Sequence, residues 1–118
     1  MSIMKILVLL FIFVFHLRNV EAFKIINGLE DIPIFKDMEY VEDSLILFDK
    51  IDGRYVSTEI VGNYKKDEVF EFYYKILPNL GWKLKDSQKF ERANETLELK
   101  SKNINNKISI IFNLYPTK

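Results

Sequence analysis

The segment 66–80 constrains the fold most, because it is the one stretch of this 118-residue chain with clear helical periodicity. Its apolar residues recur at i, i+3 and i+4, which places them along one face of a helix. Asp67 and Glu68 lie in the first turn, where acidic residues favour the helix dipole. Pro78 and Gly81 close the segment. The buried face is predicted to consist of Val69, Phe72, Tyr73, Ile76 and Leu80, with Phe70, Tyr74 and Leu77 widening it.

Strand-like segments flank this helix on both sides. Residues 44–49 and 54–61 are predicted to form a hairpin, because Asp52-Gly53 between them accepts the positive φ angles of a tight turn. Short links between segments favour antiparallel pairing. The sequence therefore predicts an α+β fold, a single, mostly antiparallel sheet of about six strands packed by one helix, in the order β-β-α-β-β-β-β. The strands after the helix are expected at 82–85, 89–92, 96–100 and 107–115.

Residues 23–43 precede the strands and show no clean period. Pro33 pushes the residue before it towards an extended conformation, and Asn27-Gly28 is a turn signal. Apolar residues nevertheless recur throughout the segment. We therefore expect an extended strap over residues 23–43 that lies on the core of an α+β domain at residues 44–118.

The first 22 residues are predicted to be a signal peptide. Lys5 is followed by an unbroken apolar run of ten residues, 6–15, and then by a polar stretch. Val20 and Ala22 fit the small-residue pocket of a signal peptidase, so we expect cleavage between Ala22 and Phe23. Because a helix needs about 20 apolar residues to span a bilayer, a permanent anchor is the second interpretation. The mature protein is expected to be exported and to be periplasmic or secreted.

Composition limits the chemistry of the mature chain. The full sequence has no Cys and one His, and His16 lies in the predicted signal peptide. The mature part then lacks a thiol nucleophile, the commonest general base and the usual ligands of zinc, copper and haem. Its adjacent carboxylates and its serines match no catalytic motif, so we expect no enzyme activity, no metal and no cofactor. The 17 basic and 17 acidic residues of the whole chain balance, which argues against nucleic acid as a partner.

Charge is distributed unevenly along the chain. Residues 30–43 hold six acids against Lys36 alone, and residues 100–118 hold four lysines and no acid. Two interpretations are open. The segments are solvated or pair with each other, or the acids form a face for a cationic partner.

A single helix covers one face of a sheet, so the other face needs another layer. Residues 45–48 are apolar on both sides of their strand, whereas 107–115 places Ile108, Ile110, Phe112 and Leu114 on one side. We expect the second face to be covered by the strap, by a second copy or by a partner. The candidate partner-facing residues are Ile46, Phe48 and Tyr55.

The predicted helix and the residues after it carry the motif Phe72-Tyr73-x-x-x-Leu77-Pro78-x-Leu80-Gly81-Trp82. With Ile32-Pro33 upstream and Phe90-Glu91-Arg92 downstream, the chain resembles small exported bacterial proteins built on this FY…LP.LGW helix–strand module. The resemblance covers nearly all of the mature chain and implies an envelope-facing α+β domain, but no activity. It also implies structural roles for Tyr73 and for Trp82, which starts the strand after the helix and packs back on it.

These features together predict a small exported domain that binds a protein or envelope component without catalysis. Its partner is expected to be an envelope protein or another copy of the chain. One alternative is an envelope component tethered by an uncleaved N-terminal segment, the one case in which a membrane is involved. The other is a carrier that holds a hydrophobic ligand between helix and sheet.

Overall fold

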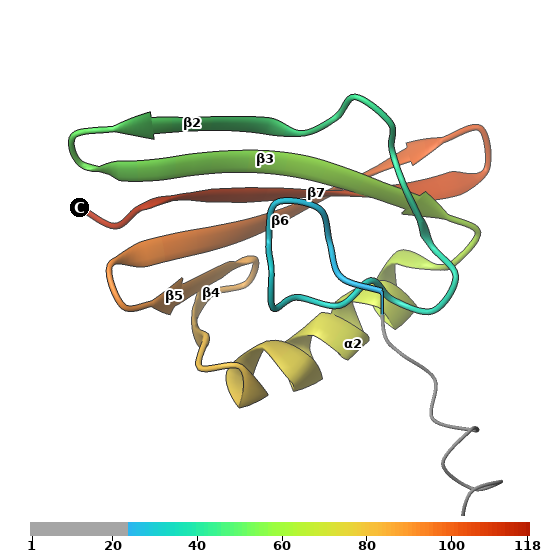
Figure 1. The fold of residues 1–118 in the computed structure, drawn as a ribbon. Helices are drawn as coiled ribbons and strands as arrows, with labels where there is room; N and C mark the ends of the chain where they lie inside the picture. The colour runs from blue at the N-terminus through green and yellow to red at the C-terminus, as the bar shows by residue number, and fades with distance from the viewer. Residues whose placement is uncertain (1–23) are drawn as a thin grey trace, which may run out of the picture.

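The computed structural model describes residues 24–118, which form one antiparallel sheet of seven strands and one helix (Figure 1). Within this range, the predicted α+β class with a single antiparallel sheet and a single helix is confirmed. The predicted signal peptide and its cleavage between Ala22 and Phe23 lie outside the described residues. In chain order the elements are β1 (Glu39–Tyr40), β2 (Ile46–Lys50), β3 (Gly53–Gly62), α2 (Lys66–Asn79), β4 (Lys83–Asp86), β5 (Lys89–Arg92), β6 (Glu95–Ile104) and β7 (Lys107–Pro116).

The order of strands across the sheet is β1-β3-β7-β6-β5-β4, and β2 also pairs with β3. β7 occupies one edge of β3, so β1 and β2 share the other edge. Tyr40 of β1 lies opposite Ile60, and Ile46 of β2 lies opposite Ser57, so the two short strands follow each other along that edge. β3 and β7 lie side by side although α2 and three strands separate them in sequence (Figure 1).

The strand count differs from the prediction, and so do several strand boundaries, by one or two residues except at the end of β6. The seventh strand is β1, which lies in the segment predicted to be an irregular strap and pairs Glu39 with Val61. β6 is predicted to end at Lys100, but it continues to Ile104 because all of its residues pair with β7. The polar turn that follows needs only Asn105 and Asn106, whose φ angles of 48° and 65° are tolerated by asparagine.

The turn between β2 and β3 lies one residue earlier than predicted. Ile51 and Asp52 form it, and Gly53 is already the first residue of β3, with a φ of 140°. A Cβ atom at Gly53 would lie 2.9 Å from Cγ of Pro116. Glycine is therefore required here both by the backbone conformation and by the close approach of the end of β7.

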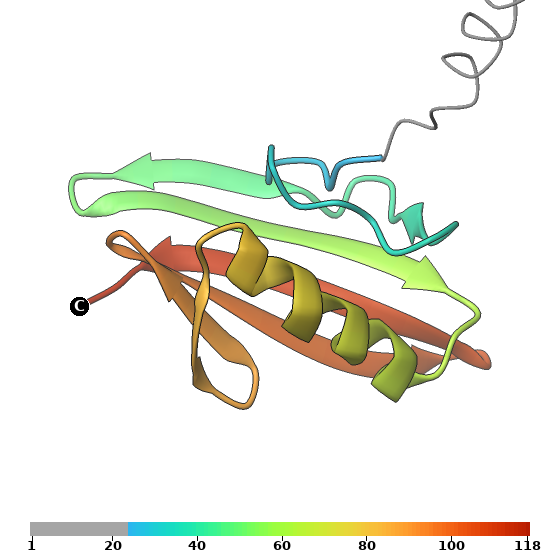
Figure 2. The ribbon, with the colours of Figure 1, turned by 90° about the horizontal axis from the view of Figure 1, so that it is seen from below.

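The helix and the strap, here residues 24–43, cover the same face of the sheet (Figures 1 and 2). Their apolar side chains form one hydrophobic core with alternate residues of β3, β6 and β7. Burial of a large apolar side chain contributes roughly 1.5–3 kcal/mol, so the strap is a main component of the core. Its buried side chains are Ile26, Leu29, Ile32, Ile34, Phe35 and Met38.

The buried face of α2 is turned relative to the predicted face. Packing on both flanks sets this angle, because Phe72 contacts Phe35 of the strap at a centroid distance of 5.0 Å, and Tyr74 contacts Phe90 of β5 at 6.0 Å. Periodicity thus locates the helix, but the rotation of the helix about its own axis is set by the elements that pack against it. The buried residues are Val69, Phe70, Tyr73 and Leu77, and the partly buried ones are Phe72, Ile76 and Leu80.

Tyr73 joins the helix, the strap and the sheet. Its hydroxyl donates a hydrogen bond to the carbonyl of Pro33 at 2.9 Å and accepts one from the N–H of Phe35 at 3.2 Å. Its ring meets the ring of Phe112 edge-on, with centroids 5.2 Å apart. Burial raises the pKa of the Tyr73 phenol, so the hydroxyl stays protonated and able to donate.

Trp82 fixes the chain where it leaves the helix. The indole is 1% exposed, and the guanidinium of Arg92 stacks on it at 4.2 Å from the ring centroid. Arg92 also donates a hydrogen bond to the carbonyl of Leu80 at 2.9 Å and forms an ion pair with Asp31 of the strap. One arginine thereby donates to a free carbonyl at the C-terminal end of the helix and links that end to the strap.

We expect Tyr73→Phe to lower the free energy of unfolding by about 1–3 kcal/mol, because it leaves the buried Pro33 carbonyl and Phe35 N–H without their partner. The matched control is Tyr74→Phe, which removes an exposed hydroxyl from the carbonyl of Ser87 and should change stability by less than about 0.5 kcal/mol. Urea denaturation of both variants measures the difference. Equal effects would contradict the assigned role of Tyr73.

Candidate functional site

The face of the sheet opposite α2 and the strap is uncovered, and we call it the open face. On β3, Val56 and Thr58 are buried under the helix side, so Tyr55 and Ser57 between them point to the open face. The strap is one of the three covers that the sequence allows for this face. It packs beside the helix instead, as the hydrogen bond from Tyr73 to its Pro33 carbonyl requires.

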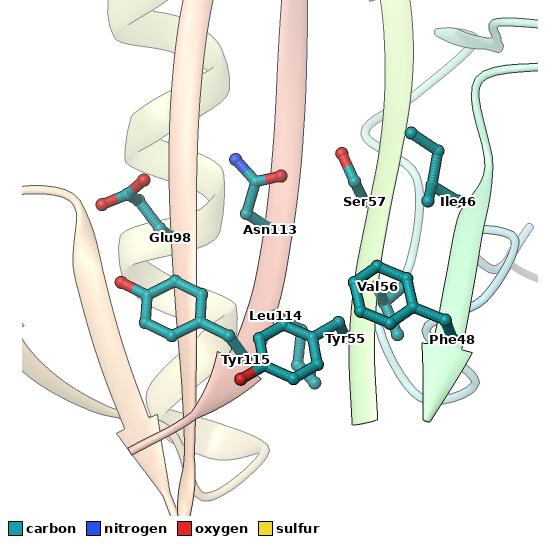
Figure 3. Close-up of a pocket in the computed structure, with 9 residues that line it drawn as sticks. All are labelled: Ile46, Phe48, Tyr55, Val56, Ser57, Glu98, Asn113, Leu114 and Tyr115. Carbon is teal, nitrogen blue, oxygen red and sulfur yellow. The ribbon is translucent and has the colours of Figure 1, made fainter. Parts of the chain in front are cut away.

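A shallow pocket of about 360 Å³ lies on the open face over β2, β3, β7 and β6 (Figure 3). Seven of its nine lining residues form two rows across the strands, one mostly polar and the other aromatic. The register places Ile46, Ser57, Asn113 and Glu98 in the first row. The second row holds Phe48, Tyr55 and Tyr115.

The three predicted partner-facing residues, Ile46, Phe48 and Tyr55, come together in this pocket. The rings of Phe48 and Tyr55 stack with centroids 5.0 Å apart and an angle of 6° between their planes. Phe48 is still 45% exposed, so much of its apolar surface contacts water. The structure thus brings these three residues together, while their contact with a partner remains a prediction.

Sequence reasoning missed the residues that β6 and β7 contribute, above all Glu98, Asn113 and Tyr115. The alternation of β7 was recognised, and it places Asn113 and Tyr115 opposite the buried Phe112 and Leu114. What the sequence did not reveal is that β7 lies next to β3. That neighbour relation alone brings Tyr115 beside Tyr55.

Charged groups surround the aromatic row. The ammonium of Lys50 lies 4.9 Å from the ring centroid of Tyr55 and 5.6 Å from that of Phe48. The Tyr55 hydroxyl donates a hydrogen bond of 2.8 Å to Asp52. This hydrogen bond raises the pKa of Tyr55, because it stabilises the protonated phenol next to a carboxylate.

The edge strand β2 adds an exposed apolar margin to the site. It pairs with β3 on one side only, and all five of its residues are exposed. Leu47 points to the helix side and Phe48 to the open face, so β2 is apolar on both sides, as the sequence predicted. Its first three residues, Ile46 to Phe48, are apolar, and an exposed apolar stretch of sheet edge is a site where another chain can pair.

The acidic strap is engaged within the molecule. Glu30 lies 3.7 Å from Arg54 of β3, and Asp31 pairs with Arg92 of β5. Over residues 24–118, the ion pairs of strap acids thus run to arginines of the sheet rather than to the C-terminal lysines. Pairing inside the molecule therefore accounts for these two acids.

The space between helix and sheet, where a carrier would hold its ligand, is filled by side chains such as Tyr73 and Phe112. The pocket lies on the outer face instead. Residues 24–118 contain no cluster of carboxylates arranged to hold a metal ion. In that same range no helix has the length and apolar character needed to cross a membrane.

Comparison with known proteins gives no relative: no family model, no curated protein and no solved structure matches the chain. Function is therefore inferred from the geometry and chemistry of its own residues.

We expect Asp52→Asn to lower the pKa of Tyr55 towards the ordinary value for tyrosine. The variant removes the carboxylate that stabilises the protonated phenol, so the tyrosinate forms at lower pH. Titration of the Tyr55 ring carbons by NMR measures this shift. Asp49→Asn is the control, because Asp49 lies opposite Arg54 in the register of β2 and β3 and points to the helix side. An unchanged Tyr55 titration in Asp52→Asn would contradict the hydrogen bond.

Proposed function

We propose that this chain is a small exported domain that binds a protein or another envelope component through its open face, without catalysis. The observation that carries the proposal is the uncovered sheet face, on which Ile46, Phe48 and Tyr55 line one pocket. The hydrophobic core lies on the other face of the sheet, so these exposed side chains are not part of it. Such patches on small proteins commonly mark interaction sites.

The physical character of the face suits binding. The strands hold the aromatic side chains at fixed spacing, so little conformational entropy is lost when a partner covers them. Tyr55 and Tyr115 present both an apolar ring and a polar hydroxyl, a combination enriched at the centres of interfaces. The free edge of β2 adds main-chain donors and acceptors that a partner strand could use.

The pocket offers little for catalysis, which supports a binding role. Glu98 is the one charged residue among the nine that line it, and residues 24–118 contain no histidine to activate Ser57. Hydrolysis of common ester, peptide or glycoside substrates by the purified protein, above the level of a Ser57→Ala variant, would refute the non-catalytic assignment.

Export rests on the sequence of the first 22 residues. A tether through an uncleaved N-terminal segment is the second candidate, and one observation makes both compatible with binding. Lys24 enters the fold through the strap, where its carbonyl accepts a hydrogen bond of 2.8 Å from Ile34 on the helix side. The described chain therefore begins on the helix side of the sheet, opposite the open face.

We expect position-specific cross-links from the open face. The chain has no Cys, so Phe48→Cys provides a single attachment point for a photoreactive maleimide in the protein isolated with its envelope fraction. Cross-links to a defined component should form from Phe48→Cys and not from Glu71→Cys, an exposed position on α2. The same products from both positions, or none from the open face, would count against the proposal.

We expect the protein recovered from fractionated cells to begin at Phe23 and to appear in the envelope or the medium. Intact mass and N-terminal sequencing measure this directly. Full-length protein in the membrane pellet would replace cleavage by tethering through the uncleaved N-terminal segment. Full-length protein in the cytoplasmic fraction would contradict both.

A further inference from the structure

The geometry of the open-face pocket points to a specific kind of partner. We infer that the pocket receives an arginine or lysine side chain from an extended, partly apolar segment of another protein. This inference rests on the proposed function and deepens it, because it names the chemistry that the open face recognises.

Charge complementarity is the first argument. Glu98 is the one charged residue that lines the pocket, and no lysine or arginine lines it. The Glu98 carboxylate lies 3.3 Å from the ammonium of Lys100 and 3.6 Å from that of Lys89. Both distances exceed the roughly 2.7–2.9 Å of a charge-assisted hydrogen bond. Among residues 24–118, no side chain donates a hydrogen bond to Glu98, so its oxygens can still accept from a ligand.

The two lysines are loosely held partners of Glu98. Their side chains are 60% and 47% exposed, whereas the Glu98 side chain is only 16% exposed. Exposed ion pairs are weak, with a worth of roughly 0–1 kcal/mol, so the lysines can turn into water when a ligand arrives. The less exposed carboxylate stays in place and gains a partner with better geometry.

The aromatic row is the second argument. Figure 3 shows the rings of Phe48, Tyr55 and Tyr115 face-on from the solvent side, lying across the strands. The face of an aromatic ring carries the negative part of its quadrupole and attracts cations. Lys50 already makes a cation–π contact of this kind, with its ammonium 4.9 Å from the Tyr55 centroid. Of the cation–ring contacts formed by the described residues, none involves Tyr115, which lies on the Glu98 side of the pocket.

The remaining residues define the rest of the ligand. Ile46 and Phe48 form the apolar end of the pocket, and Ser57 and Asn113 supply hydrogen-bonding groups between that end and Glu98. A guanidinium fits a carboxylate with two parallel hydrogen bonds and stacks on aromatic rings, so arginine fits better than lysine. An arginine flanked by apolar residues therefore matches the full length of the site.

The test is an NMR titration of the ¹⁵N-labelled protein, in the form recovered from cells, with the peptide acetyl-Leu-Arg-Leu-amide. We expect saturable shifts at the amides of Glu98, Asn113 and Tyr115. The same peptide with citrulline keeps the shape of arginine but has no charge, and it should bind at least about tenfold more weakly. N-acetylglucosamine tetramer is titrated in parallel, because aromatic rows and amides also bind sugars.

Two variants tie the binding to the pocket. Glu98→Gln should lower the affinity for the arginine peptide by about tenfold, since it removes the negative charge of the side chain and keeps its shape. Glu91→Gln is the matched control on β5, where Glu91 pairs with Lys85 at 3.6 Å and lies outside the pocket, and it should leave binding unchanged. Tyr115→Leu provides a second test within the aromatic row and should also weaken binding. Dispersed amide spectra confirm that each variant is folded.

Equal binding of the citrulline peptide, an unchanged affinity in Glu98→Gln, or shifts with the sugar alone would each overturn the inference. These failures are distinguishable from failure of the proposed function. Cross-links from Phe48→Cys without peptide binding would reject the cationic ligand and keep the binding face. The absence of both the cross-links and the peptide binding would reject the proposal that the open face is a binding surface.

Discussion

The hydroxyl of Tyr73 is the interaction on which the arrangement of the molecule depends. It holds the strap to the helix through Pro33 and Phe35, so that both lie on one side of the sheet. The cost of leaving these buried polar groups unpaired keeps the three parts together. With the strap committed to the helix side, the opposite face of the sheet has no cover from the described chain.

The pairing of β3 with β7 then turns that bare face into a site. It aligns Ser57 with Asn113, and it brings Tyr115 beside Tyr55 although 60 positions separate them in sequence. β2 extends the same rows with Ile46 and Phe48. The result is an apolar and aromatic pocket lined by one carboxylate, on a sheet whose other face carries the hydrophobic core. A packed core on one face of the sheet and an exposed aromatic pocket on the other suit a binding module.

Several elements could be predicted from local sequence alone. The helix at 66–80 follows from its period, and the alternation at 107–115 correctly separates Phe112 and Leu114 from the outward residues. The errors have a common cause. The extra strand β1, the extension of β6 to Ile104 and the turned face of α2 all depend on neighbours distant in sequence. Propensity and periodicity describe a segment, whereas pairing partners are chosen by the whole chain.

The candidate site divides in the same way. The sequence by itself determined that Ile46, Phe48 and Tyr55 lie on a strand pair with more apolar surface than one helix can cover, because alternation fixes which side chains share a face. It also determined that the chain has no Cys and a single His, at position 16. Only the tertiary structure decided that the strap covers the helix side and that Glu98, Asn113 and Tyr115 complete the pocket. Those contacts join segments whose order in the sheet no local pattern encodes.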